Sequence, residues 1–483
     1  MAKKLYKDLI STSGTYLIVS LISITIGIAF PRLLGPDEWG LWSITAGLIG
    51  MVGPVAQMAM STTLVTYISK YKKDKEKVTT LINSAYLIAV LSSLLVALSI
   101  IALSGYLAES VFEDSRLGIF FLSGSAIIFF EQLNIINRDY FRGFKDFKKY
   151  NLLKIVPSLS VLIVALALFF LFSYKAIFFV YAQVGVFAVI FLTVLFYLLR
   201  YESTFKPFKG PNKKATITVL KFGVPLIFTM TFVKLMKSMD RVLVGYFLEA
   251  ADVGVYSVAA GIPLMIGSML APVSIVLLPT FSERKAEGIS SSTLLGEILS
   301  FLLFISIPLT VILHFFSGEI LRFIYGTEYL GGDMVLSIAA LEILLFGGYV
   351  LFRTSIQATE KTGKLALAIG VSALLNFSLN LVLIPLLGIE GAAVGTVASF
   401  FLLFLLTIYM VNRNYKIDFN AMNLKAISAL AVILTILGYV FSYTFSGVIS
   451  IFMCAAVFAP IWFALVHISS PRWYEVMIDY IFG

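Results

Sequence analysis

Apolar segments long enough to cross a bilayer dominate this sequence and most constrain its fold. A helix needs about 20 apolar residues to cross the hydrocarbon core, and the runs here are too long and too uniformly apolar for barrel strands. Only 13% of the 483 residues are charged, which is about half the fraction in a soluble globular chain. The sequence therefore predicts an all-α polytopic membrane protein with about 14 transmembrane helices. We place them at roughly 9–32, 41–68, 79–104, 117–137, 151–171, 176–199, 219–245, 253–281, 292–316, 333–357, 363–386, 390–411, 424–445 and 448–468.

Lysine and arginine are concentrated on one side of these predicted helices. With the N-terminus in the cytoplasm, 28 of the 36 Lys and Arg residues fall in cytoplasmic segments and 4 in outer loops. Such a bias sets the orientation of membrane proteins, and here it places both termini in the cytoplasm. It also explains the net charge of +9 without a nucleic-acid partner. The single cysteine, Cys454, excludes an internal disulfide.

The sequence contains an internal duplication at a constant offset of 214 residues. The matching pairs are Gly40 with Gly254, Ser43 with Ser257, Ala46 with Ala260, Gly47 with Gly261, Met51 with Met265 and Gly53 with Gly267. The offset maps the first predicted helix onto the seventh, so two six-helix repeats have the same orientation in the membrane. We therefore expect an N-terminal bundle at 1–200, a basic cytoplasmic linker at 201–221, a second bundle at 222–411, and two further helices with a short tail at 412–483.

Beyond Lys221 at its start, the seventh predicted helix contains four charged residues. Lys234, Lys237 and Arg241 are spaced i, i+3 and i+7, so they share one helix face. Lys234 lies roughly 20 Å into the helix, near the middle of the membrane. Asp240 lies three residues from Lys237, where the two side chains can pair. A charge at that depth is costly unless it is paired or meets water, so this face predicts a cation-lined cavity for an anionic ligand; structural pairing of the cations is the alternative.

Other charges in the predicted helices have less certain roles. Arg353 in the tenth helix and Arg32 at the outer end of the first are further candidate ligand-binding residues, although Arg32 could instead fix the loop through Asp37. Glu131 and Glu342 are candidates for ion coupling, together with Asp240, or for charge balance against the cations. Buried carboxylates are common at both kinds of site.

Several classes of function lack their sequence signals. The only Gly-Lys pair, Gly363-Lys364, has neither the upstream glycine nor the following hydroxyl residue of a phosphate-binding loop. With two histidines and one cysteine, the sequence offers no metal-ligand cluster and no nucleophile–histidine–acid set. We therefore expect neither an enzyme nor a cofactor.

Four segments resemble a known family. They are PRLLGPDEWGLWSI (31–44), MDRVLVGYFLEAADVGVYSVA (239–259), RGFKDFKKYN (142–151) and QATEKTGK (357–364). In this order they are similar to the helix junctions and basic loops of the polysaccharide and O-antigen flippases of the multidrug/oligosaccharidyl-lipid/polysaccharide (MOP) superfamily. The resemblance implies a V-shaped pair of bundles in the plasma membrane. It also implies that a polyprenyl-linked oligosaccharide is moved from the cytoplasmic to the outer leaflet by alternating access, with Na⁺ or H⁺ as the coupling ion.

Two alternatives stay open on the sequence alone. One is an ion-coupled multidrug exporter of the same superfamily, although exporters of organic cations would not need a face of three cations. The other is a membrane glycosyltransferase or polymer ligase acting on the same lipid-linked sugars, which would want a larger outer loop with catalytic acids. The expected partners are the lipid-linked oligosaccharide, membrane lipids and polysaccharide assembly proteins, and we expect a monomer.

The charge bias leads to a prediction of topology. In a Cys454→Ala background, Lys73→Cys should resist a membrane-impermeant thiol reagent in intact cells and react once the cells are permeabilised. A cysteine at Ser173, in a predicted outer loop, is the control and should react in intact cells. Labelling of Lys73→Cys in intact cells would contradict the predicted orientation.

Overall fold

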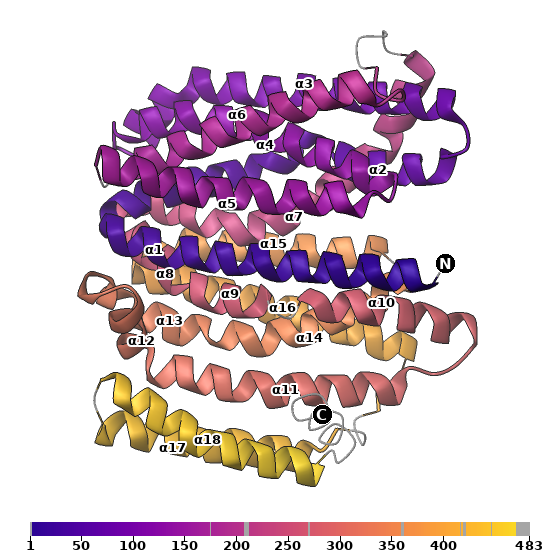
Figure 1. Ribbon diagram of the computed structural model, residues 1–483. Helices are drawn as coiled ribbons and strands as arrows, with labels where there is room; N and C mark the ends of the chain where they lie inside the picture. The colour runs from indigo at the N-terminus through magenta and orange to yellow at the C-terminus, as the bar shows by residue number, and fades with distance from the viewer. Residues whose placement is uncertain are drawn as a thin grey trace. The chain divides into compact units, whose positions relative to one another are not determined.

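The computed structural model describes residues 2–173, 175–206, 212–268, 271–358, 362–415, 417–418, 422–445 and 447–469. Across these residues the chain is helical and has no strand (Figure 1), which confirms the all-α prediction. In hydrocarbon a helix satisfies its own backbone hydrogen bonds, which is why long apolar segments fold this way. The middle of the predicted linker, 207–211, and the tail after Ser469 lie outside the described residues.

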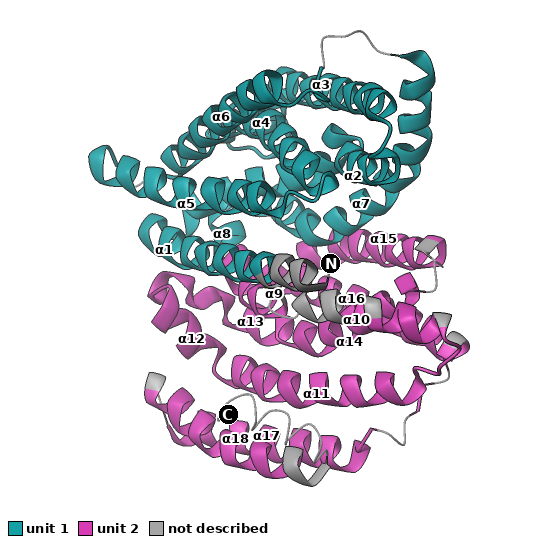
Figure 2. Ribbon diagram, turned by 45° about the vertical axis from the view of Figure 1, so that its right-hand side comes forward, with its two compact units in different colours: residues 1–254 teal, residues 255–483 magenta. Residues whose placement is uncertain are grey.

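Residues 1–254 form one compact unit, which we call unit 1 (teal in Figure 2). A π-helical turn, Leu107–Val111, follows its third helix. The helices are α1 (Ala2–Gln57), α2 (Met60–Tyr71), α3 (Lys75–Tyr106), α4 (Leu117–Gly143), α5 (Phe147–Leu171), α6 (Ala176–Tyr201), α7 (Lys213–Phe247) and the start of α8 (Ala250–Ala259).

Residues 255–483 form the second compact unit, unit 2 (magenta in Figure 2). A 3₁₀ segment, Thr327–Gly332, precedes α13. After the end of α8 its helices are α9 (Gly261–Ser268), α10 (Ala271–Ala286), α11 (Ser292–Phe315), α12 (Ser317–Ile324), α13 (Asp333–Ala339), α14 (Leu341–Ala358), α15 (Thr362–Leu387), α16 (Ile389–Tyr415), α17 (Leu424–Thr444) and α18 (Val448–Ser469).

The described residues contain eleven helical segments long and apolar enough to cross a membrane, or up to twelve if the bent pair of Thr327–Ala339 with Leu341–Ala358 is one span. This confirms a multi-pass membrane protein. One of the eleven, Ser11–Tyr71, has 61 residues, which is enough for more than one crossing at about 20 residues each. Ile449–Leu465 is a shorter apolar helix. The predicted number of fourteen spans stays a prediction.

Local backbone breaks divide several predicted helices. Gly35 in α1 has φ 78° and ψ 170°, a conformation that only glycine adopts readily, and it separates the predicted helices 9–32 and 41–68. The second of these is interrupted again, because Met58 and Ala59 have positive φ angles between α1 and α2. The predicted helix 253–281 likewise falls into α8, α9 and α10.

The first and seventh helices pack together within unit 1. α7 begins at Lys213, inside the predicted linker of 201–221, and it packs along α1 and also contacts α2 and α3. Among the buried residues of this unit, Met60, Leu133, Tyr140 and Val219 belong to one apolar cluster. The predicted domain boundaries at 200, 221 and 411 stay predictions.

Two glycines related by the 214-residue offset make reciprocal contacts. A Cβ atom on Gly40 would overlap the carbonyl oxygen of Ala250, and one on Gly254 would overlap the carbonyl oxygen of Pro36. Pro36 and Ala250 are themselves 214 residues apart. When residue i contacts j and the equivalent of j contacts the equivalent of i, the two segments are related by a local two-fold axis. The contact therefore joins equivalent parts of the two repeats through their backbones.

This contact predicts a specific loss of stability. Gly40→Ala or Gly254→Ala would push two backbones apart, and we expect each to destabilise the protein by roughly 1–3 kcal/mol, measured as a lower melting temperature of the purified protein in detergent. Gly105→Ala is the control, because a Cβ atom there would meet nothing within 4 Å; it should leave the melting temperature unchanged or raise it. Equal melting temperatures for all three variants would contradict the close contact.

Candidate functional site

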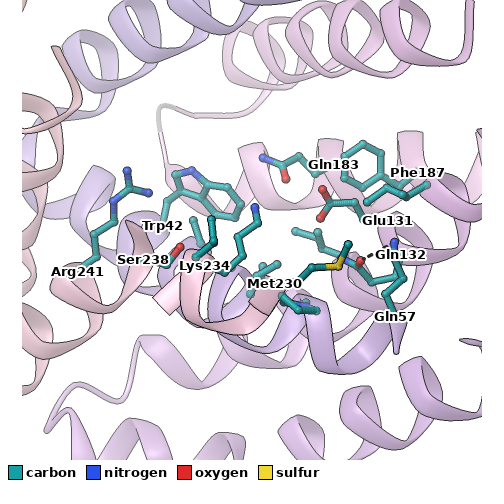
Figure 3. Close-up of a pocket in the computed structure, with 18 of the residues that line it drawn as sticks. Trp42, Gln57, Glu131, Gln132, Gln183, Phe187, Met230, Lys234, Ser238 and Arg241 are labelled. Atoms are coloured by element: carbon teal, nitrogen blue, oxygen red, sulfur yellow. Dashed lines mark hydrogen bonds between the residues drawn. The ribbon is translucent and has the colours of Figure 1, made fainter. Parts of the chain in front are cut away.

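A polar cavity of about 650 Å³ lies inside unit 1 (Figure 3). Four helices line it, namely α1, α4, α6 and α7. Its lining comprises Trp42, Ala46, Ile49, Gly50, Gly53, Pro54 and Gln57 of α1; Ile127, Glu131, Gln132 and Ile135 of α4; Gln183 and Phe187 of α6; and Thr229, Met230, Val233, Lys234, Ser238 and Arg241 of α7. All four helices contain segments apolar enough to cross a membrane, so this is a polar cavity within spanning helices.

Two of the three predicted cations of α7 line this cavity. Lys234 and Arg241 are seven residues apart, about two helical turns, so both face the same space (Figure 3). Lys237 is exposed and is not among the lining residues. Asp240 is buried, with 5% of its surface exposed, and is also outside the lining. The cationic face of the cavity is therefore built from Lys234 and Arg241.

Glu131 brings a carboxylate to the same cavity from α4. Figure 3 shows Glu131 and Lys234 projecting into the cavity from different helices. The cations that interact electrostatically with the Glu131 carboxylate are Lys234 and Arg138. The lining among the described residues thus carries two cations and one carboxylate. In a medium of low dielectric constant, the net positive charge of this lining favours an anionic ligand.

Small residues of α1 hold α7 in this position. A Cβ atom on Gly47 would lie 3.0 Å from the Val242 side chain and 3.3 Å from Cβ of Arg241. One on Gly50 would overlap the Ser238 hydroxyl. Glycine lets two helices approach closely in a membrane, and here the close approach places Ser238 and Arg241 at the cavity. Both glycines belong to helix 41–68 of the sequence prediction, and Gly47 is one of the duplicated positions.

Amides and aromatic rings, which the sequence prediction did not select as site residues, complete the lining. Nε2 of Gln57 donates to Oε1 of Gln132 at 3.4 Å, and Gln183 faces the cavity from α6 (Figure 3). Trp42 and Phe187 add two aromatic side chains. A buried glutamine in an apolar helix is a detectable signal, but it is equally typical of hydrogen bonding between helices.

The remaining predicted site residues lie elsewhere. Arg353 and Glu342 are both on α14 in unit 2, where the Arg353 guanidinium lies 6.0 Å from the centre of the Tyr349 ring and Glu342 is 5% exposed. Arg32 is exposed on α1. None of these three residues lines the cavity of unit 1, and their predicted roles stay predictions.

Arg116, which the sequence prediction did not select, binds two carboxylates beside the break in α1. Its guanidinium contacts Asp37 at 2.5 Å and Asp114 at 2.8 Å. Partial burial raises the pKa of the Asp114 carboxyl, but the hydrogen bonds and charge of Arg116 outweigh it and bring that pKa below its ordinary value. The ion pairs tie the segment after Gly35 to the start of α4. This supports a loop-fixing role for Asp37, with Arg116 as its partner.

The described residues hold no group of three or more His, Cys, Asp or Glu side chains that could bind a metal ion. What the cavity does offer is two positive charges, one negative charge, amide donors and acceptors, and two aromatic faces. Guanidinium and ammonium groups make strong charge-assisted hydrogen bonds to phosphate or carboxylate. Amides and rings suit hydroxyl groups and the apolar faces of sugar rings.

Comparison with known proteins places this geometry in context. Residues 29–332 match the model of a family described as "Polysaccharide biosynthesis protein". Over 165 residues the chain is 32% identical to a probable low-salt glycan biosynthesis flippase, Agl15, of Haloferax volcanii; the match covers 34% of this chain and 35% of that protein. It thus spans only about a third of that relative's length. An uncharacterized membrane protein of Methanocaldococcus jannaschii is 22% identical over 425 residues, covering 83% of this chain and 82% of the relative.

Two solved structures share the fold. The lipid II flippase MurJ in an inward closed conformation has a TM-score of 0.78 and 18% identity, over 98% of this chain and 100% of that one. A multidrug resistance MATE family transporter of the MOP superfamily, in an inward-facing conformation, has a TM-score of 0.65 and 14% identity, over 83% of this chain and 94% of that one. The fold is therefore that of MOP transporters, as the sequence resemblance implied.

The position of Glu131 predicts an energetic coupling to Lys234. Removing either charge alone leaves the other without its counter-charge, so Glu131→Gln and Lys234→Gln should each lower the melting temperature. The double variant should lose less than the sum of the two, with a coupling of roughly 1 kcal/mol. Glu131→Gln combined with Lys237→Gln is the control and should be additive. Additivity in both cycles would show that Glu131 does not balance Lys234.

Proposed function

Because the chain belongs to the polysaccharide biosynthesis protein family, we propose that it is a flippase for a lipid-linked oligosaccharide. Its substrate would carry a polyprenyl phosphate or pyrophosphate and would move from the cytoplasmic to the outer leaflet by alternating access. The product would serve surface polysaccharide or glycan assembly. The match to a probable glycan biosynthesis flippase supports this proposal.

The observation that carries the proposal is the pair of cations in the unit 1 cavity. A phosphate or pyrophosphate head must leave water to cross a membrane, and it needs compensating charge along the way. Lys234 and Arg241 supply that charge on one face of α7, and Arg241 can donate two parallel hydrogen bonds to a phosphate. Glu131 offsets one of the two charges, which keeps the empty cavity from being strongly positive.

The other lining residues suit the sugar portion. Gln57, Gln132 and Gln183 offer both donors and acceptors, and each is at least nine-tenths buried. Trp42 and Phe187 provide apolar faces on which sugar rings can pack. These features support a glycan as cargo, because a phosphate alone would not use them.

The same charges argue against the alternative of an exporter for organic cations. The fold does not separate the two functions, since a multidrug resistance transporter and a lipid II flippase both resemble this chain. The charges of the cavity support the flippase, because a lining with two cations and one carboxylate is net positive and would repel a cationic drug. The alternative of a glycosyltransferase or ligase gains no support from the geometry of this cavity.

Energy coupling and cellular setting are part of the proposal. Glu131, Asp240 and Glu342 are the candidate carboxylates for coupling to a Na⁺ or H⁺ gradient; the last two are buried in α7 and α14. We place the protein in the plasma membrane with both termini in the cytoplasm, acting as a monomer beside polysaccharide assembly proteins. Its lipid and glycan partners follow from the proposed activity.

Neutralising Lys234 should impair transport selectively. In proteoliposomes with a fluorescent polyprenyl-pyrophosphate-linked oligosaccharide, Lys234→Gln and Arg241→Gln should each slow flipping by at least about tenfold, the loss of one charge-assisted hydrogen bond. Lys237→Gln removes the same charge from the same helix outside the cavity and is the matched control. It should transport at nearly the wild-type rate.

The outcome distinguishes the candidate functions. Equal rates for Lys234→Gln, Arg241→Gln and wild-type protein, at matched amounts of folded protein, would overturn the proposed site. Wild-type transport of an organic cation such as ethidium, without transport of the lipid-linked oligosaccharide, would favour the exporter. Flipping that continues unchanged after every ion gradient is collapsed would remove the proposed coupling.

A further inference from the structure

A second cavity in unit 1, of about 420 Å³, adjoins the first. It lies among α1, α4, α5 and α6, and α7 contributes nothing to its lining. The two cavities share a wall made of Trp42, Glu131, Ile135, Gln183 and Phe187. The proposed function uses the first cavity only, so the second needs its own explanation.

One end of this α1–α5 cavity is cationic. Arg138 and Lys154 both line it. Arg138 lies five residues before the end of α4 and Lys154 seven residues after the start of α5, so each is roughly 8–10 Å from a helix end. The two helices are joined by the short loop 144–146. Both cations are therefore at the depth where a spanning helix meets the lipid headgroups.

Tyrosine rings hold these two cations in place. The Lys154 ammonium lies 2.7 Å from the centre of the Tyr16 ring, and the Arg138 guanidinium lies 5.7 Å from the centre of the Tyr150 ring. The hydroxyl groups of Tyr16 and Tyr150 are 3.4 Å apart and hydrogen-bonded. Cation–π contacts of this kind orient a cation without neutralising its charge. The pair is thus arranged before any ligand binds.

The acids near this end do not balance the charge. Asp139 lies 4.0 Å from Arg138, but it is closer to Arg142, at 3.3 Å, and also accepts a hydrogen bond from Ser61. Lys154 is repelled by both arginines. Among the described residues, the buried Nε of Arg138 has no hydrogen-bond partner.

Two further charged groups complete the surroundings. Glu131 lies seven residues before Arg138 on α4, roughly 10 Å away along the helix. Lys149, at the start of α5, is held by Asp146 at 3.2 Å and Glu202 at 3.5 Å. The surplus at the end of the cavity is therefore positive, and an anion placed between Arg138 and Lys154 would relieve the repulsion.

Along α5 the lining of the cavity becomes apolar away from this end. Ser158 and Val161 follow Lys154 along α5, and Val161 is roughly 10 Å deeper in the bundle. Ile26 and Phe179 line the same cavity from α1 and α6. Pro157 lies inside α5, where it removes one backbone hydrogen bond. On this α5 side polarity thus falls from the headgroup depth inward, in the same order as in a membrane lipid, whereas Glu131 and Gln183 keep the wall shared with the first cavity polar.

We propose that the α1–α5 cavity binds an anionic lipid. Its phosphate lies between Arg138 and Lys154, and its apolar part extends past Ser158 toward Val161 and Phe179. The ligand chemistry is a phosphate attached to a hydrocarbon chain, which either a phospholipid or a polyprenyl carrier supplies. The site does not depend on the flippase activity, because it requires only that the chain lies in a membrane.

Lipid binding to the purified full-length protein tests this proposal. By native mass spectrometry, phosphatidylglycerol should bind the wild-type protein at least about tenfold more tightly than phosphatidylcholine. Arg138→Gln with Lys154→Gln should remove this preference, because the charge-assisted contacts are lost. Lys145→Gln with Lys148→Gln is the matched control: it removes the same charge beside the same loop from residues outside the lining, and it should keep the preference.

A second variant separates occupancy from charge. Ser158→Trp fills the middle of the cavity and keeps both cations, so it should weaken phosphatidylglycerol binding as strongly as the double variant. Normal elution on size exclusion shows that each variant is folded. Unchanged binding by either folded variant would overturn the site.

Comparing several ligands in the same binding experiment identifies the source of the phosphate. Tighter binding of a polyprenyl phosphate than of phosphatidylglycerol, lost in both variants, would support the site and assign it to the lipid carrier. The reverse order would support it and assign it to bulk phospholipid. Inorganic phosphate or free glucuronate that binds as tightly as either lipid would overturn the lipid and leave an anion site for a soluble group.

Discussion

The hydrocarbon of the membrane offers no hydrogen-bond partner and little screening of charge, and this constraint underlies the whole structure. It makes the described chain helical, because a helix satisfies its own backbone. It also makes each buried charge depend on a partner or on a cavity. Lys234, in a helix apolar enough to span, is therefore matched by a carboxylate on another helix and by a polar cavity of about 650 Å³. The charge of Lys234 needs the cavity and its carboxylate to be tolerated within a spanning helix.

The close approach of α1 and α7 makes that match geometrically feasible. Gly47 and Gly50 leave no side chain where Ser238, Arg241 and Val242 approach. Further along, the backbone contacts of Gly40 and Gly254 join equivalent segments of the duplicated sequence. Repeats of this kind meet about a two-fold axis, so one glycine pattern serves both sides of the contact.

The two cavities of unit 1 share a wall that carries one carboxylate. On one side Glu131 faces Lys234, and on the other it lies along α4 from Arg138. A single acid between two sets of cations leaves both cavities positive, which suits a phosphate-bearing lipid in each of them. An anion bound on one side would change the electrostatic environment of Glu131, and thus of the opposite side, without any movement of the helices. Glu131 therefore links the electrostatics of the two cavities.

The sequence by itself determined the class of the protein and the helix that carries the site. Long apolar segments predicted a polytopic helical fold, the 214-residue offset revealed the duplication, and the spacing of Lys234 and Arg241 placed them on one face. These properties are local or periodic, so they can be read along one chain segment. The tertiary structure decided which residues meet that face. Glu131 and Gln183 lie 103 and 51 residues before Lys234 in the sequence. Lys237 is excluded because the cavity covers only part of the α7 surface. Helical periodicity defines the faces of a single helix but not its rotation against its neighbours; that rotation is set by packing, here by the glycines of α1.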